Sequence, residues 1–359
     1  MRTDAQAIPV APDQNRAIHS VGRLLLLVGA AGVLLALVLA LTGHDPARAF
    51  ATMIRGAFGN WYQFVSVTLV RSVPLALTGL AVAVAFRAGI LNIGAEGQLI
   101  AGAAAAATTA TVLTDVSGFI AIPVLLVSGI AAGGVWAGIA AWLRRRFGVL
   151  EVISTIMLNF VAQNLVGFLV RGPLQEPLRI YPQSPSLPEN LQLPVLIPST
   201  RLHIGALIAV IAAVGLWYWL SHYASGFRVR AVGQNVHAAA LAGRINIARV
   251  GVGVFILSGM LAGLAGVVEY TGVTYALYEN LSPGYGYTAI AVALLARLNM
   301  LAVLGTALLF GALDAGASAM QRDAGIPNVV VNIVHASLIL LVLVADRWSQ
   351  RASSAERGT

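Results

Sequence analysis

Five ionisable side chains interrupt long apolar runs of this chain: Arg71, Glu96, Glu269, Asp314 and His335. An ionisable group inside an apolar segment is costly to keep there, so each is a functional candidate. Glu96 is the strongest, because its neighbours are small or polar: Asn92, Gly94, Gly97 and Gln98. Such glycines permit a broken or closely packed helix whose polar groups face a cavity. The alternative for Glu96 is an interior salt bridge with Arg71. Glu269 and Asp314 lie near predicted segment ends, where snorkelling or solvation explains them.

Amide side chains form a second group of candidates. Asn159, Gln163 and Asn164 stand at i, i+4 and i+5, which places them on roughly one helical face. Amides there suit hydrogen bonding to a sugar ring or a base edge, and they serve equally well as contacts between helices. Asn332 and His335 form a similar i, i+3 pair, although a lone histidine is more often a packed core residue than a ligand. The predicted polar lining of a pathway is therefore Asn92, Glu96, Gln98, Asn159, Gln163, Asn164, Asn332 and His335.

Other chemistry finds no support in the residues. There is no G-x-x-x-x-G-K-[ST] phosphate loop, no cluster of metal ligands and no nucleophile with an adjacent base. Cysteine is absent, which excludes thiolate metal ligation and disulfides. We therefore expect no catalytic residue, no metal and no cofactor, and any energy from ATP must come from a separate protein.

Composition indicates the elements that position these side chains. Hydrophobic residues make up 58% and charged residues only 10%, against about a quarter charged in soluble domains. The net charge of +8 comes entirely from scattered arginines, which favours anchoring of membrane loops over nucleic-acid binding. Unalternating Ala/Leu/Val/Gly runs predict an all-α polytopic membrane protein with about nine or ten transmembrane helices. The predicted helices are 23–42, 64–86, 89–113, 118–143, 151–170, 203–222, 249–269, 286–297, 300–320 and 328–346.

Two of these segments need comment. The run 23–42 is too long for the apolar core of a signal peptide, so it predicts an uncleaved first helix. The segment 286–297 is too short to span alone, which predicts a re-entrant or broken helix.

The arginines predict the orientation. If the N-terminus is cytoplasmic, fifteen arginines fall inside, six fall outside and Arg71 lies within a span, as the positive-inside rule requires. We thus expect a bacterial inner-membrane protein with cytoplasmic tails at 1–22 and 347–359 around a permease domain at 23–346. A proline-rich external loop, 171–202, is too rich in proline for a helix. It divides the domain into halves, 23–170 and 203–346. An odd number of spans in each half predicts inverted topology.

The cytoplasmic loop 223–248 is exceptional in length. Asn235 suits a helix N-cap and Gly243 a C′ position, which predicts a short helix at 236–242. A helix of about two turns is not stable alone, and its small side chains allow close docking against a partner. An interfacial helix on lipid headgroups is the alternative, although the segment lacks the Trp, Phe or Leu content that membrane insertion favours.

Four motifs carry a family resemblance. The loop sequence Phe227–Asn235, followed by the Ala-rich helix, resembles the coupling segment of ATP-binding-cassette (ABC) importer permeases for nucleosides, simple sugars and branched-chain amino acids. The run Phe86–Gln98 resembles the F-x-x-G-x-x-N-I-G-A-E-G-Q signature of the nucleoside and simple-sugar branch. Glu151–Asn159 and the segment Pro283–Ala296 match two further family motifs in the correct order. One departure is Asn299-Met300, where many relatives have Asn-Pro.

The resemblance implies the permease subunit of an ATP-driven importer that moves nucleosides by alternating access. It implies a cytoplasmic ATPase, an external substrate-binding lipoprotein and a second permease subunit, identical or related. A simple sugar is the alternative cargo, and a branched-chain amino acid is less favoured. An ion-coupled secondary transporter is the competing class, against which the capped loop helix argues. The residues that the resemblance assigns to ATPase coupling are Gly226, Arg228, Arg230, Gly233, Asn235, Ala239 and Gly243.

Overall fold

The structure is a computed structural model that describes residues 43–241 and 245–327, together with isolated positions at 29, 32–33, 36–37, 39–41, 329, 333 and 336–337. The predicted first and last spans, 23–42 and 328–346, therefore lie mostly outside the described residues. The chain divides into two units, one made of Met1–Ala49 with Ile326–Thr359 and the other of Phe50–Gly325. All the packing described below lies within the second unit.

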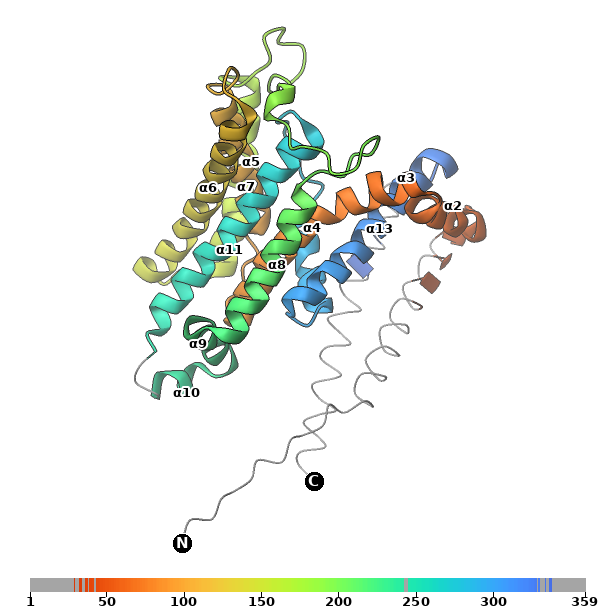
Figure 1. The fold of residues 1–359 in the computed structure, drawn as a ribbon. Coiled ribbons are helices and arrows are strands. Elements are labelled where there is room, and N and C mark those ends of the chain that lie inside the picture. The colour runs from red at the N-terminus through yellow and green to blue at the C-terminus, as the bar shows by residue number, and fades with distance from the viewer. Residues whose placement is uncertain are drawn as a thin grey trace, which may run out of the picture. The chain divides into compact units, whose positions relative to one another are not determined.

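The described part of the chain is helical, and its only β-structure is two isolated bridges. Among the described residues, six helices are long and apolar enough to cross a membrane: Trp61–Arg87, Gly118–Phe147, Glu151–Arg171, Gly205–His222, Ile247–Thr274 and Met300–Ala324. They are labelled α3/η1/α4, α6, α7, α8, α11/η3 and α13, where η1 (Phe64–Leu69) and η3 (Tyr270–Thr274) are π-helical turns (Figure 1). The prediction of an all-α polytopic membrane protein is confirmed.

The remaining described helices are shorter: α2 (Pro46–Phe58), α5 (Ala95–Ala110), α9 (Ala224–Gln234), α10 (Val236–Leu241) and α12 (Tyr285–Leu295). At 1.5 Å per residue, α5 is about 24 Å long and α12 about 16 Å, both short of the roughly 30 Å hydrocarbon layer. The predicted shortness of 286–297 is confirmed. The predicted span 89–113 is wrong at its start, because Ala88–Gly94 forms a turn and α5 begins only at Ala95.

The core of this unit is built around α4 and α11. Helix α11 packs mainly on α5, α6 and α4, and α4 packs on α13, α11 and α12. Glycines permit the closest approaches: a Cβ added at Gly133 on α6 would stand 2.7 Å from the Cα of Gly263 on α11. Interfaces of small residues are how membrane helices gain van der Waals contact without a hydrophobic driving force. The glycines therefore fix α6 against α11.

The two ends of this unit carry different connections (Figure 1). Helices α9 and α10 lie at one end, beside the junction between α4 and α5. At the other end the connection from α7 to α8 is largely irregular, with one short 3-10 turn at Glu189–Leu191, as its prolines predicted. That connection packs on neighbouring turns: Asn190 donates to the carbonyl of Val116 at 3.0 Å, and Ser184 donates through its backbone N–H to the carbonyl of Leu277 at 2.8 Å.

Candidate functional site

Helices α5 and α12 begin side by side inside the unit. The carboxyl Oε2 of Glu96, in the first turn of α5, accepts a 2.7 Å hydrogen bond from the backbone N–H of Gly286, in the first turn of α12. Because α5 and α12 are each too short to span, and their N-termini touch, we infer that both helices start in the interior of the membrane. Helix N-termini carry unsatisfied N–H groups and partial positive charge. This junction therefore offers hydrogen-bond donors at membrane depth, as the broken helices of transporters do.

Glycine is required at this junction. A Cβ at Gly286 would stand 2.5 Å from the Cα of Glu96 and 2.8 Å from the carbonyl carbon of Ala95, well inside ordinary contact. Ser282 supports the same point, because its Oγ accepts the backbone N–H of Tyr285 at 3.1 Å. Glu96 is 1% exposed, and its recorded hydrogen bonds lie within the chain. The alternative of an ion pair between Glu96 and Arg71 is wrong, because Arg71 pairs with Asp314.

Asn92 and Gln98 form a buried network with Ser258, a residue that no sequence pattern indicated. Asn92 Nδ2 donates to Gln98 Oε1 at 2.9 Å and to Ser258 Oγ, on α11, at 2.7 Å. Ser258 in turn donates to the carbonyl of Ala81 on α4 at 2.5 Å. All three polar side chains are buried. The network ties α4, α5 and α11 together at the break before α5.

The three amides predicted on α7 do not converge. Asn159 is buried and holds the same break: its Oδ1 accepts the N–H of Gly97 at 2.9 Å, and its Nδ2 donates to the carbonyl of Ile93 at 3.1 Å. Gln163 is half-buried, and Asn164 is exposed and donates to the carbonyl of Phe160 within its own helix. Asn332 and His335 lie outside the described residues. The structure thus gathers Asn92, Glu96, Gln98 and Asn159 around the start of α5 and leaves Gln163 and Asn164 apart.

The predicted coupling loop contains two helices rather than one. Asn235 Oδ1 accepts the N–H of Ala238 at 3.0 Å, so the predicted N-cap of α10 is confirmed. The preceding helix, α9, was missed. Gly226 lets α9 turn tightly against α8, because a Cβ there would stand 2.6 Å from the Cα of Leu220. Gly233 brings the end of α9 onto the end of α4, because a Cβ there would stand 2.8 Å from the carbonyl carbon of Arg87.

The side chains of α9 and α10 divide into buried and exposed sets. Ala239 is buried, whereas Arg228 is exposed, Arg230 is half-buried and neither has an ion-pair partner among the described residues. Leu241 is 88% exposed. A cavity of about 450 Å³ lies between these helices and the nearby ends of α4, α6 and α11. Gly243 lies outside the described residues. A basic and apolar surface at a helix pair suits contact with another protein.

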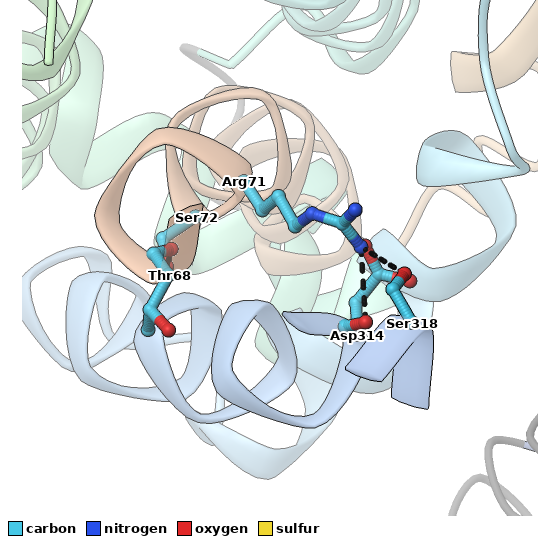
Figure 2. Close-up of polar contacts among 5 residues, drawn as sticks. All are labelled: Thr68, Arg71, Ser72, Asp314 and Ser318. Carbon is cyan, nitrogen blue, oxygen red and sulfur yellow. Dashed lines mark hydrogen bonds and ion pairs between the residues drawn. The ribbon is translucent and has the colours of Figure 1, made fainter. Parts of the chain in front are cut away.

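A polar cluster that the sequence did not predict lies on α4 and α13 (Figure 2). Arg71 Nη1 donates to Asp314 Oδ2 at 2.6 Å, to the carbonyl of Asp314 at 2.9 Å and to Ser318 Oγ at 2.7 Å. The expectation that Asp314 lies near a span end is wrong, since ten residues of α13 follow it. Opposite charges in two predicted spans were the only sequence signal for this pair, and nothing indicated Ser318. Glu269 lies near a span end as expected, with the five residues of η3 after it, and its Oε2 has no hydrogen-bond partner in the described structure.

The fold and these internal polar groups define a multi-pass membrane protein of the transporter kind, with broken helices and a helix pair exposed at one end. Residues 64–343 match the family described as the branched-chain amino acid transport system / permease component. The chain belongs to this family of ABC transporter permeases.

Three curated relatives cover most of the chain. It is 38% identical to the guanosine ABC transporter permease protein NupP of Bacillus subtilis, over 86% of this chain and 88% of the relative. It is 36% identical to the glucose ABC transporter permease protein TsgB13 of Haloferax volcanii, over 84% and 81%. It is 32% identical to the nucleoside ABC transporter permease protein NupB of Lactococcus lactis, over 86% of each. No solved structure matches the chain.

Proposed function

We propose that this chain is the membrane permease subunit of an ATP-driven importer that carries nucleosides across the cytoplasmic membrane of a bacterium. The observation that supports this cargo most directly is the 38% and 32% identity to permeases named for guanosine and for nucleosides. A separate cytoplasmic ATPase hydrolyses ATP, and the permease contributes no catalytic residue and no cofactor. An external binding protein delivers the nucleoside. A second permease completes the pathway, as the further similarity to NupQ, a second guanosine permease protein of Bacillus subtilis, suggests.

The geometry supports a coupling route. The ATPase contacts α9 and α10 at their exposed residues, among them Leu241 and Arg228. Gly233 joins the end of α9 directly to Arg87 and the turn after α4. That turn leads to Asn92, which is bonded to Gln98 on α5 and to Ser258 on α11. A shift of α9 is therefore passed on to the start of α5 through packed backbone and buried hydrogen bonds, which are the physical carriers of such coupling.

The docking proposal is tested at an exposed side chain, so that folding is spared. Leu241→Asp places a charge on the surface of α10. We expect this variant to lose ATPase co-purification and ATP-driven uptake. Leu178→Asp is the matched control: Leu178 is 78% exposed in the connection from α7 to α8, and its variant should keep the ATPase bound. Equal ATPase retention by both variants would remove α10 from the docking surface.

Positions 178 and 241, at opposite ends of the unit, also serve to test the proposed orientation. Because the chain has no native cysteine, single cysteines at positions 178 and 241 report sidedness without background. In intact cells a membrane-impermeant thiol reagent should label Leu178→Cys and spare Leu241→Cys, as the distribution of arginines predicts. Labelling of position 241 alone would reverse the proposed orientation.

A simple sugar is the second candidate cargo, favoured by the 36% identity to a permease named for glucose. The two cargoes are separated by uptake in cells that express the complete transporter. Radiolabelled guanosine should accumulate, and a hundredfold excess of unlabelled glucose should not compete. Competition by glucose and not by adenosine would assign the transporter to sugars.

A further inference from the structure

The cluster of Arg71, Asp314 and Ser318 lies deep in the membrane-spanning part of the unit. Arg71 is ten residues from the start of Trp61–Arg87, and Asp314 is ten residues from the end of Met300–Ala324. Each residue therefore lies about 15 Å along its helix from that end, well inside a segment long and apolar enough to cross a membrane.

The ion pair is nevertheless accessible. The side chains of Arg71 and Asp314 are 29% and 26% exposed. An arginine or aspartate that faced lipid within a membrane span would be strongly unfavourable. Intramembrane ionisable residues instead face a bundle interior or a water-filled cavity. The accessible side of this pair is therefore a polar surface inside the assembled transporter.

The arginine is anchored through one nitrogen only. All three of its recorded hydrogen bonds leave from Nη1, toward Asp314 and Ser318 (Figure 2). In the described part of the chain, Nε and Nη2 have no recorded partner. A guanidinium carries five N–H donors in a fixed planar fork, so the Nε–Nη2 edge remains able to donate two parallel hydrogen bonds.

A buried carboxyl group interacts electrostatically with this ion pair. The carboxyl group of Glu269, on α11, interacts with Arg71 and with Asp314, and its Oε2 is buried without a hydrogen-bond partner among the described residues. Buried carboxyl oxygens are nearly always bonded, so one without a partner indicates a missing donor. Among the described residues, the Nε–Nη2 edge of Arg71 therefore has no acceptor and Glu269 Oε2 has no donor.

We propose that Arg71, held by Asp314 and Ser318, is a cargo-binding residue of the translocation pathway and recognises a nucleobase that presents a carbonyl oxygen beside a ring nitrogen. The proposal rests on the proposed nucleoside cargo and deepens it. Guanine and hypoxanthine carry this pair of acceptors, and guanine O6 and N7 match the arginine fork. Both bases also carry a ring N–H that can donate to a carboxyl oxygen such as that of Glu269. Adenine has an amino group in place of the carbonyl and cannot accept both bonds.

The first test asks whether the cluster faces water. Ser318→Cys is made in the otherwise cysteine-free chain, within the complete transporter in membrane vesicles. Leu309→Cys is the matched control, since nine residues on a helix place the two positions on opposite faces, and Leu309 lines an apolar groove. We expect a charged methanethiosulfonate reagent to label position 318 at least tenfold faster than position 309, and excess guanosine to slow that labelling.

Two results of this experiment would overturn the proposal. Equal labelling of positions 318 and 309 would place the cluster against lipid or under another part of the chain. Formation of a disulfide between two copies of Ser318→Cys, without protection by guanosine, would make the cluster a contact between permeases rather than a cargo site.

The second test measures selectivity and does not depend on a cysteine variant. Arg71→Lys keeps the charge but loses the fork. We expect the ratio of guanosine to adenosine uptake, each as maximal rate over KM, to fall by about tenfold, in line with the loss of one bidentate contact. A merely structural role would reduce both cargoes equally, and that result would overturn the proposal. If the unmodified transporter imports glucose and no nucleoside, the proposed cargo itself fails, whereas labelling of position 318 still shows whether the cluster faces water.

Discussion

The contact between the N-termini of α5 and α12 leads to a sharp prediction for Gly286→Ala. The added methyl group would stand 2.5 Å from the Cα of Glu96, whereas ordinary carbon contacts begin near 3.5 Å. The two helix starts must therefore separate by about 1 Å. Such overpacking costs about 1–3 kcal/mol.

The separation also stretches the 2.7 Å bond from Gly286 N–H to Glu96 Oε2. Leaving a buried donor unsatisfied costs about a further 1–3 kcal/mol, so the total destabilisation is about 2–6 kcal/mol. Gly305→Ala is the control, because Gly305 lies in α13 and a Cβ there meets nothing within 4 Å. An alanine in place of glycine in a helix is neutral or stabilising, by up to about 1 kcal/mol.

The assay is thermal unfolding of the detergent-purified chain, followed by uptake in cells. At about 2 °C per kcal/mol for a chain of this size, Gly286→Ala should melt at least about 4 °C below the unmodified chain, and Gly305→Ala at or slightly above it. Uptake should be lost only in Gly286→Ala. If the two variants melt at the same temperature and transport equally well, the helix starts do not meet as described, and the inference that α5 and α12 begin inside the membrane is refuted.

Two further predictions concern buried ionisable side chains. Glu96→Gln keeps an acceptor for Gly286 N–H, so it should change stability by less than about 1 kcal/mol while altering the maximal uptake rate. Glu96→Leu loses the acceptor and should lower stability by about 1–3 kcal/mol. Unchanged uptake kinetics in Glu96→Gln would return Glu96 to a structural role. His203, before the start of α8, is 1% exposed, and burial together with the nearby Arg201 lowers its pKa from 6.5 to about 4. The unfolded state binds a proton at His203 below pH 6.5, whereas the folded state binds it only near pH 4. The free energy of unfolding is therefore highest above pH 6.5 and falls by about 3 kcal/mol as the pH drops toward 4. His203→Gln should flatten that part of the stability profile measured by urea unfolding, and a slope as steep as that of the unmodified chain would assign the pH dependence to other groups.

Hydropathy predicts where the long helices lie, and it misplaces the one break that matters most for the site. Ile90, Leu91 and Ile93 are apolar, so hydropathy starts the second predicted span at residue 89, six residues before α5 begins at Ala95. The interruption is made by backbone conformation. Gly89 adopts φ +75°, and Asn92 Oδ1 accepts the N–H of Gly94 at 2.9 Å, which closes a turn that hydrophobicity does not encode.

Helix α9 was missed for a different reason. Its sequence contains Gly226 and Gly233 and has little intrinsic preference for a helix. Its position depends on tertiary contacts: Gly226 packs against α8 and Gly233 against Arg87. By contrast, the N-cap of α10 was predictable, because an Asx cap is a local interaction between Asn235 and the next turn.

Pairings across long sequence separations were beyond a single sequence. Arg71 and Asp314 were each recognisable as ionisable groups in apolar runs, but only the fold brings residues 243 positions apart into one cluster. The same holds for Asn92 and Ser258, and for Glu96 and Gly286. Residue type therefore indicated which side chains matter at depth, and the fold was needed to decide which of them stabilise the chain and which remain able to bind cargo.

Buried side chains that stabilise the chain and side chains that remain able to bind cargo have different parts in the mechanism. Asn92, Gln98 and Asn159 are buried and bonded within the chain, so they have little capacity left to bind a cargo directly. They hold the start of α5 in place between the turn that α9 contacts and the N-terminus of α12. Arg71 of the polar cluster lies near the start of α4, and the turn that α9 contacts follows the other end of this helix, after Arg87. A displacement of α9 toward or away from that turn therefore acts on the Arg87 end of α4, the helix that carries Arg71. On the proposed function, α4 is the element that links ATPase closure to the cargo-binding face.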